Sequence, residues 1–280
     1  MIDYKKYGDR LVVGVSGGKD STAVCLHLLE QGLTKSDFDR VFIDTGWESS
    51  CTYEYIDRLQ ADIGSIIKIK KEIPIPKEHK EFCMKIENRL GFESPFVRRI
   101  LKGLIFSNPK AKWCTPELKT QPLKKYFDTL DYDPINVVGI RREESRRRAA
   151  LAESEWADHL DCYVYRPILD WSFDDVVAIH KRFGIIPNRL YFEANQKRVG
   201  CFPCIFQSKK AITGLSEDRV EIIEELERYV TAHKGRESTF LRQGRIRDVY
   251  LWSKTSYGGR QFELFDLRER GCEKWGMCGV

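Results

Sequence analysis

The sequence contains no run of apolar residues that approaches the roughly 20 needed for a membrane-spanning helix. Its first residues, Met1–Lys6, are polar and do not resemble a secretory signal peptide. Neither an internal repeat nor a low-complexity linker is present. These absences argue against a membrane protein and a repeat array, and they predict a cytoplasmic globular protein with no membrane partner.

The composition is that of an ordinary globular chain, with 42% hydrophobic and 32% charged residues. Its length of 280 residues suffices for one α/β domain with an appendage, or for two small domains. The net charge of +5 suits ligands that carry phosphate and permits nucleic acid, but it requires neither.

Nine cysteines are present, and an odd number in a cytoplasmic chain argues against a disulfide framework. Four of them are isolated and are expected to be core or incidental thiols, namely Cys25, Cys51, Cys83 and Cys162. The other five lie near glycine or proline and are candidates for redox chemistry or metal binding: Cys114, Cys201, Cys204, Cys272 and Cys278.

A β-branched apolar run, residues 11–15, leads directly into a loop of small residues, Ser16–Ser21, and then into a helical pattern. Gly17 and Gly18 permit positive φ and close approach, so that backbone N–H groups can converge on an anion at a helix N-terminus. Lys19 adds a mobile positive charge. The glycines are adjacent and Asp20 follows the lysine, so this is not the Walker-type phosphate loop. The stretch predicts a phosphate site, and the alternative is a plain turn with serine caps.

Strand and helix patterns alternate along the chain, with further strands expected at 40–43, 66–69 and 135–140. This order predicts an α/β fold with an open, mostly parallel sheet and helices on both faces. We expect an α/β domain with the phosphate site over residues 1–210, a mainly helical insert at about 76–112, and a C-terminal extension over 211–280. Ligands bind beyond the carboxyl ends of parallel strands, which places the site after Val15, Ile43 and Ile140.

Several separated blocks carry a family resemblance: S-G-G-K-D-S at Ser16, V-F-I-D-T-G-W-E at Val41, G-I-R-R-E-E-S-R-R-R-A at Gly139, L-D-W-S at Leu169 and R-V-G-C-F-P-C at Arg198. In these blocks, over residues 9–206, the chain resembles the phosphoadenosine-phosphosulfate (PAPS) reductase family of the PP-loop superfamily. Members of that Rossmann-like superfamily typically split a nucleotide between its α and β phosphates.

The resemblance implies a set of nucleotide-binding residues. Phosphates would be held by Ser16, Gly17, Gly18, Lys19, Asp20 and Ser21, and the adenine nucleotide would be flanked by Asp44, Thr45 and Gly46. Arg141, Arg142 and Arg146 would meet the remaining phosphate or sulfate charge, since guanidinium groups match tetrahedral oxyanions. The alternative for the arginines is a solvated helix start balanced by Glu143 and Glu144.

The resemblance also concerns the cysteines. Cys114, Cys201 and Cys204 are similar to the set that holds a [4Fe–4S] cluster in the iron–sulfur members, although Trp113 replaces one cysteine of the usual pair. Cys272 or Cys278 is a candidate fourth ligand, and a site open to sulfide is an alternative. Zinc held by four thiolates fits the same residues, and Cys201-x-x-Cys204 alone also fits a redox dithiol.

Near the C-terminus, Cys278-Gly279 is similar to the Glu-Cys-Gly tail that carries the nucleophilic cysteine of sulfonucleotide reductases. Met277 stands in place of the glutamate. The alternative hypothesis is that Cys278 is a free thiol in the C-terminal tail.

Three functions follow from these features. The leading prediction is an enzyme that uses ATP and Mg²⁺, with Lys19 and Asp20 as catalytic residues, to adenylate an acceptor before sulfur transfer from a donor protein. Nucleic acid is one candidate acceptor. The alternative is a reductase of adenosine 5′-phosphosulfate (APS) or PAPS, in which Cys278 attacks sulfur and a thioredoxin-like reductant releases sulfite. The third is a nucleotide sensor without turnover.

Overall fold

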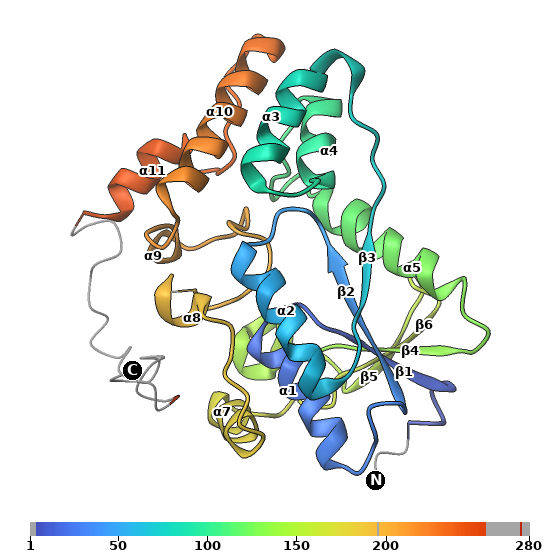
Figure 1. The fold of residues 1–280 in the computed structure, drawn as a ribbon. Coiled ribbons are helices and arrows are strands. Elements are labelled where there is room, and N and C mark those ends of the chain that lie inside the picture. The colour runs from blue at the N-terminus through green and yellow to red at the C-terminus, as the bar shows by residue number, and fades with distance from the viewer. Residues whose placement is uncertain (1–3, 195, 256–274, 276–280) are drawn as a thin grey trace.

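The computed structural model describes residues 4–194, 196–255 and 275. A six-stranded sheet has the strand order β3-β2-β1-β4-β6-β5. Its strands are β1 (Arg10–Gly14), β2 (Phe38–Asp44), β3 (Ile67–Lys70), β4 (Pro134–Val137), β5 (Ser154–Ala157) and β6 (Cys162–Tyr165). Every neighbouring pair is parallel except β5 and β6. The predicted α/β fold with a mostly parallel sheet is confirmed (Figure 1).

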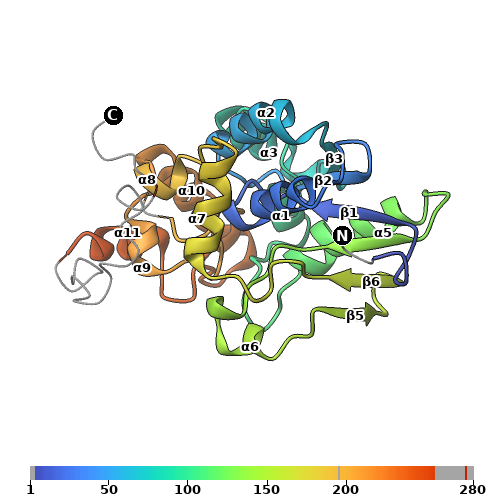
Figure 2. The ribbon, with the colours of Figure 1, turned by 90° about the horizontal axis from the view of Figure 1, so that it is seen from below.

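Helices cover both faces of this sheet, as the alternation of side chains along β1 requires. Leu11 and Val13 point to the face covered by α1 (Lys19–Glu30), α2 (Ser50–Ile63) and α7 (Phe173–Arg182). Val12 points to the opposite face, where it packs in one cluster with Phe127 of α5 (Gln121–Phe127). Figure 2 shows α7 running alongside α1, with β5 and β6 at the outer edge of the sheet.

The fourth strand ends earlier than expected, and the β5–β6 hairpin is an addition to the predicted sheet. The strand ends at Val137, and Gly139 then packs against the start of α1. A Cβ at Gly139 would lie 2.7 Å from the carbonyl carbon of Asp20, so no larger residue fits there. In the hairpin, Trp156 is 49% exposed, and strands this short carry little hydrophobic alternation.

The insert and the extension share one hydrophobic core. The insert contributes α3 (Lys80–Leu90) and α4 (Pro95–Gly103), which follow the short η1 (Lys77–His79), and the extension contributes α10 (Glu217–Lys234) and α11 (Ile246–Ser253). Figure 1 shows α3, α4 and α10 together, on the far side of the molecule from α7. Arg89 of α3 forms ion pairs with Asp218, Glu221 and Glu225 of α10. The expected division of the chain at residue 210 stays a prediction.

The remaining elements are short: η2 (Pro116–Thr120), η3 (Arg142–Glu144), α6 (Arg146–Ala149), α8 (Leu190–Glu193) and α9 (Lys209–Ile212). Ser172 caps α7 as expected, because its Oγ accepts the N–H of Asp175 at 3.2 Å while Asp175 accepts the N–H of Ser172 at 2.8 Å. Among the helices that the structure describes, none is long and apolar enough to cross a membrane.

Candidate functional site

The small-residue loop forms the turn between β1 and α1 that the sequence predicts. Gly17 has φ +76°, and a Cβ there would lie 2.8 Å from Thr52. Ser21 closes the loop, since its Oγ accepts the N–H of Ser16 at 3.1 Å and donates to the carbonyl of Gly18 at 3.0 Å. The serines therefore fix the loop, and Lys19 begins the helix beside it.

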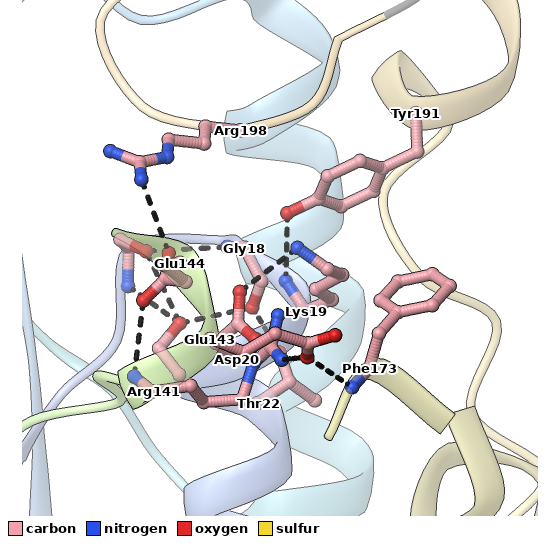
Figure 3. A network of polar contacts seen from close by, with 12 residues as sticks. Gly18, Lys19, Asp20, Thr22, Arg141, Glu143, Glu144, Phe173, Tyr191 and Arg198 are labelled. Atoms are coloured by element: carbon pink, nitrogen blue, oxygen red, sulfur yellow. Dashed lines mark hydrogen bonds and ion pairs between the residues drawn. The ribbon is translucent and has the colours of Figure 1, made fainter. Parts of the chain in front are cut away.

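A chain of charges joins this loop to the arginine block after β4 (Figure 3). Lys19 Nζ lies 3.0 Å from Asp20 Oδ2, and Arg141 Nε lies 2.7 Å from Asp20 Oδ1. Arg141, only 4% exposed, also pairs with Glu143 at 2.5 Å. Burial opposes ionisation of Asp20, but the charges of Lys19 and Arg141 outweigh it and hold the Asp20 pKa below its usual value. The sheet edge thus holds two buried cations that share one carboxylate.

Residues far along the chain support Lys19 from several sides. Its backbone N–H donates to Tyr191 Oη at 3.0 Å, and its carbonyl oxygen lies 2.9 Å from His180 Nε2. Its ammonium group lies 5.1 Å from the ring centroid of Tyr191 and 5.7 Å from that of Phe173. Burial lowers the pKa of His180, so the ring is neutral near pH 7 and its Nε2–H donates to the Lys19 carbonyl.

The other two predicted arginines lie differently. Arg142 pairs with Asp170 at 2.6 Å and donates to the carbonyls of Ala149 and Leu151, so it fastens the segment around α6. Arg146 is exposed at the start of α6 and has no ion pair or hydrogen bond within the described part of the chain. Arg141 alone of the three is buried against the loop.

Asp44, Thr45 and Gly46 form the turn that follows β2. Asp44 accepts the N–H of Gly46 at 2.7 Å and pairs with Lys70 at 2.8 Å. Thr45 Oγ1 donates to Glu48 at 2.7 Å. Gly46 is packed against the residues that begin α4. These contacts shape the turn, and the role of its residues beside the adenine ring stays a prediction.

The described cysteines of the candidate metal set, Cys114, Cys201 and Cys204, all act electrostatically on one lysine, Lys119. Cys201 Sγ lies 3.8 Å from Thr45 Oγ1 and 3.9 Å from Glu48 Oε1. The charge that Cys201 carries when it is ionised has the largest effect on the pKa of Lys119, and with Glu48, Cys204 and Cys114 it raises that pKa against the effect of burial. Burial raises the pKa of Cys201 to about 11, although Lys119 opposes this shift.

These thiols do not by themselves complete a metal centre. Within residues 4–194, 196–255 and 275, no three His, Cys, Asp or Glu side chains are arranged to hold one ion. Cys272 and Cys278, the candidate fourth ligand and the candidate nucleophile, lie outside the described residues. The described donors are soft and suit iron or zinc, so the [4Fe–4S] or zinc site stays a prediction.

Besides Lys119, a second cation, Arg219, interacts electrostatically with Cys201, and the sequence did not predict it. Arg219 of α10, 7% exposed, donates to the carbonyl of Glu48 at 2.8 Å. Its guanidinium carbon lies 4.7 Å from the ring centroid of Trp47. Burial lowers the Arg219 pKa to about 10. No local pattern distinguishes this arginine from the others on an amphipathic helix.

The phosphoadenosine phosphosulfate reductase domain family matches residues 10–207, and the chain belongs to this enzyme family. It is 31% identical to an uncharacterized 37.8 kDa protein of Escherichia phage 186, over 94% of each chain. It is 25% identical to the adenosine 5′-phosphosulfate reductase of Staphylococcus saprophyticus, over 77% of each chain. Its fold is similar to that of PAPS reductase from Candida auris, with a TM-score of 0.50 and 17% identity over 70% of this chain and 83% of that one.

Proposed function

We propose that this chain is an enzyme that binds ATP at the Ser16–Ser21 loop and adenylates an acceptor, which then receives sulfur. The observation that carries the proposal is the ion-pair chain Lys19–Asp20–Arg141, buried at the carboxyl edge of the sheet beside an intact loop. Lys19 and Arg141 share Asp20, and the second carboxylate on Arg141 is Glu143, whose side chain is 56% exposed, so both cations can exchange a protein carboxylate for a polyanionic ligand.

In the proposed reaction, triphosphate oxygens replace Asp20 as the partners of Lys19 and Arg141. Asp20 would hold Mg²⁺, which supplies further charge neutralisation when bound. An acceptor oxygen attacks the α-phosphorus, the bond to the bridging oxygen breaks, and pyrophosphate leaves. A sulfur nucleophile then displaces AMP from the adenylated acceptor. Lys19 and Arg141 stabilise the charge that develops on the phosphates.

The cysteines supply the sulfur side of the proposal. Cys201 lies against Thr45, which follows β2, while the phosphate loop follows the neighbouring strand β1. Cys201 and the loop therefore share one edge of the sheet. A [4Fe–4S] cluster, or zinc, would be held by Cys114, Cys201, Cys204 and Cys272, and it would supply redox or sulfur-ligating chemistry there.

A second candidate is a sulfonucleotide reductase, favoured by the 25% identity to a named APS reductase over 77% of both chains. The Cys278 thiolate would attack the sulfate sulfur and break its bond to the phosphate oxygen. AMP or its 3′-phosphate would leave, and thiols of a thioredoxin-like reductant would release sulfite from the enzyme thiosulfonate.

One pair of assays separates these functions. Pyrophosphate release is measured with ATP, Mg²⁺ and DNA, RNA or small hydroxyl acceptors, and sulfite release with APS or PAPS and dithiol. We expect pyrophosphate from the wild type and from Lys68→Ala, an exposed-lysine control, but none from Lys19→Ala. Sulfite release that is lost in Cys278→Ser would instead establish the reductase. ATP binding without release of pyrophosphate or sulfite would instead support a nucleotide sensor without turnover.

A further inference from the structure

Trp275 is the one described residue that follows Thr255. It is 8% exposed and belongs to the same hydrophobic cluster as Leu11, Val13 and Ile179. In the sequence it is the single large apolar side chain between Leu267 and Met277. An isolated aromatic residue in a polar segment, buried against distant elements, has the character of an anchor rather than of a regular core position.

Trp275 contacts two residues of helix α7. Its ring centroid lies 5.1 Å from that of His180, with the planes at 82°, and 6.2 Å from that of Phe173, with the planes at 90°. Both contacts have the edge-to-face geometry that aromatic pairs prefer. The indole thus covers the N-terminal and the C-terminal part of the same helix.

Both partners of Trp275 also contact Lys19. His180 Nε2 donates to the Lys19 carbonyl at 2.9 Å, and the Lys19 ammonium lies 5.7 Å from the Phe173 ring. The other ring nitrogen, Nδ1, lies 3.3 Å from the carbonyl oxygen of Ile185. Trp275 therefore packs on one residue that hydrogen-bonds to the Lys19 backbone and on another whose ring lies near the Lys19 ammonium group.

We propose that Trp275 is a positioning residue for the nucleotide site. Its indole keeps water from His180 and holds Phe173 in place, so that Lys19 is ordered before the phosphates arrive. Without the indole, water would compete for the bond from His180 to the Lys19 carbonyl, and the loop would lose part of its order. This inference rests on the proposed nucleotide binding, and it ties the C-terminal extension to that binding.

The test uses the full chain with Trp275→Ala, Trp275→Phe and the control Trp156→Ala, which removes the half-exposed indole of β5. The first readout is the titration of the His180 ring by NMR. Burial lowers the His180 pKa, and the charged groups that act on it are Asp20 and Lys19. The second readout is the dissociation constant for ATP with Mg²⁺, measured by calorimetry.

We expect Trp275→Ala to move the His180 pKa up toward its ordinary value and to weaken ATP binding about tenfold, a typical strength of coupling between linked groups. Trp275→Phe should keep the His180 pKa and the ATP affinity close to the wild-type values, and Trp156→Ala should change neither quantity. Circular dichroism confirms that each variant is folded, and the phenylalanine variant keeps the test valid if the alanine variant unfolds.

Three results would overturn the inference in distinguishable ways. An unchanged His180 titration in both Trp275 variants would show that Trp275 does not pack on His180. An altered titration with unchanged ATP affinity would reject the positioning role alone. A wild-type chain that binds no ATP would reject the proposed function and the positioning role with it. The His180 titration would still show whether Trp275 packs on His180.

Discussion

Arg141 and Asp20 form a 2.7 Å ion pair across 121 residues of sequence, between the segment after β4 and the first turn of α1. Arg141 is almost fully buried, so its charge is offset by protein groups and not by water. Removing one member leaves the other with a single charged partner, Lys19 for Asp20 or Glu143 for Arg141, and so destabilises the loop. Because ATP phosphates would replace Asp20 as the partner of Arg141, ATP binding and the stability of the loop should affect each other.

Arg141→Lys tests the need for a guanidinium fork at this position. The variant keeps the charge but loses the geometry that binds Asp20 and Glu143 together, so ATP affinity should fall about tenfold or more. Calorimetry measures the change. The control is Arg147→Lys on exposed α6, which should bind ATP as the wild type does. Equal ATP affinities of the wild type and Arg141→Lys would show that the Arg141 guanidinium does not contact the nucleotide.

Gly139→Ala tests the close passage of the chain over α1. The added Cβ would meet the Asp20 carbonyl carbon at 2.7 Å, and the clash is with backbone, which cannot move aside cheaply. We expect a loss of about 1–3 kcal/mol in the free energy of unfolding, measured with urea. Gly14→Ala is the matched control, because its Cβ would have 3.8 Å of clearance from the nearest atom. A stable Gly139→Ala variant would contradict this packing.

Tyr191→Phe removes the hydroxyl that accepts the Lys19 N–H at 3.0 Å. The ring remains, and with it the contact to the ammonium group. A buried N–H left without an acceptor costs about 1–3 kcal/mol, so stability and ATP affinity should both fall modestly. Urea unfolding and calorimetry report the two effects. Tyr163→Phe, in β6, serves as the comparison, and equal losses in both variants would contradict a role specific to the loop.

Glu227 in α10 predicts a pH dependence of stability. Its carboxylate accepts the N–H groups of Phe240 at 2.8 Å and Ile246 at 3.0 Å, yet burial raises its pKa to about 7. A pKa raised in the folded state means that folding favours the protonated form. The stabilisation is full below about pH 4.5 and is lost as pH rises through about 7.

Urea unfolding of the wild type should therefore show a stability that declines between about pH 5 and 8, by at most about 3 kcal/mol. Glu227→Gln should flatten that decline, because the amide does not titrate. The comparison variant is Glu237→Gln, at an exposed position. If Glu227→Gln keeps the full pH slope of the wild type, another group causes it.

The sequence was sufficient for the local parts of the site. The run from β1 through Ser16–Ser21 into α1 has its own periodicity and glycine chemistry, and so has the end of β2. The arginine block could be placed because carboxyl ends of parallel strands meet at one edge. Selecting Arg141 over Arg142 could not be done, because their partners are distant in sequence: Arg141 pairs with Asp20 of α1 and Arg142 pairs with Asp170.

The supporting residues had no sequence signal of their own. Tyr191 and His180 reach Lys19 from 172 and 161 residues away, and an isolated tyrosine or histidine in a helical pattern is typical of many surfaces and cores. Lys119 lies on the π-helical turn η2, a local widening of the helix that no propensity predicts. Arg219 comes from beyond the matched family region and meets Glu48 only through the shared core.

Binding of an adenine nucleotide by Lys19 and its loop is tested by calorimetric titration of ATP with Mg²⁺ into the wild type and Lys19→Ala. We expect saturable binding by the wild type and by Lys68→Ala, and an ATP affinity at least about a hundredfold lower in Lys19→Ala, as for a buried charged contact worth about 3 kcal/mol. Equal ATP affinity in the wild type and Lys19→Ala would contradict this expectation.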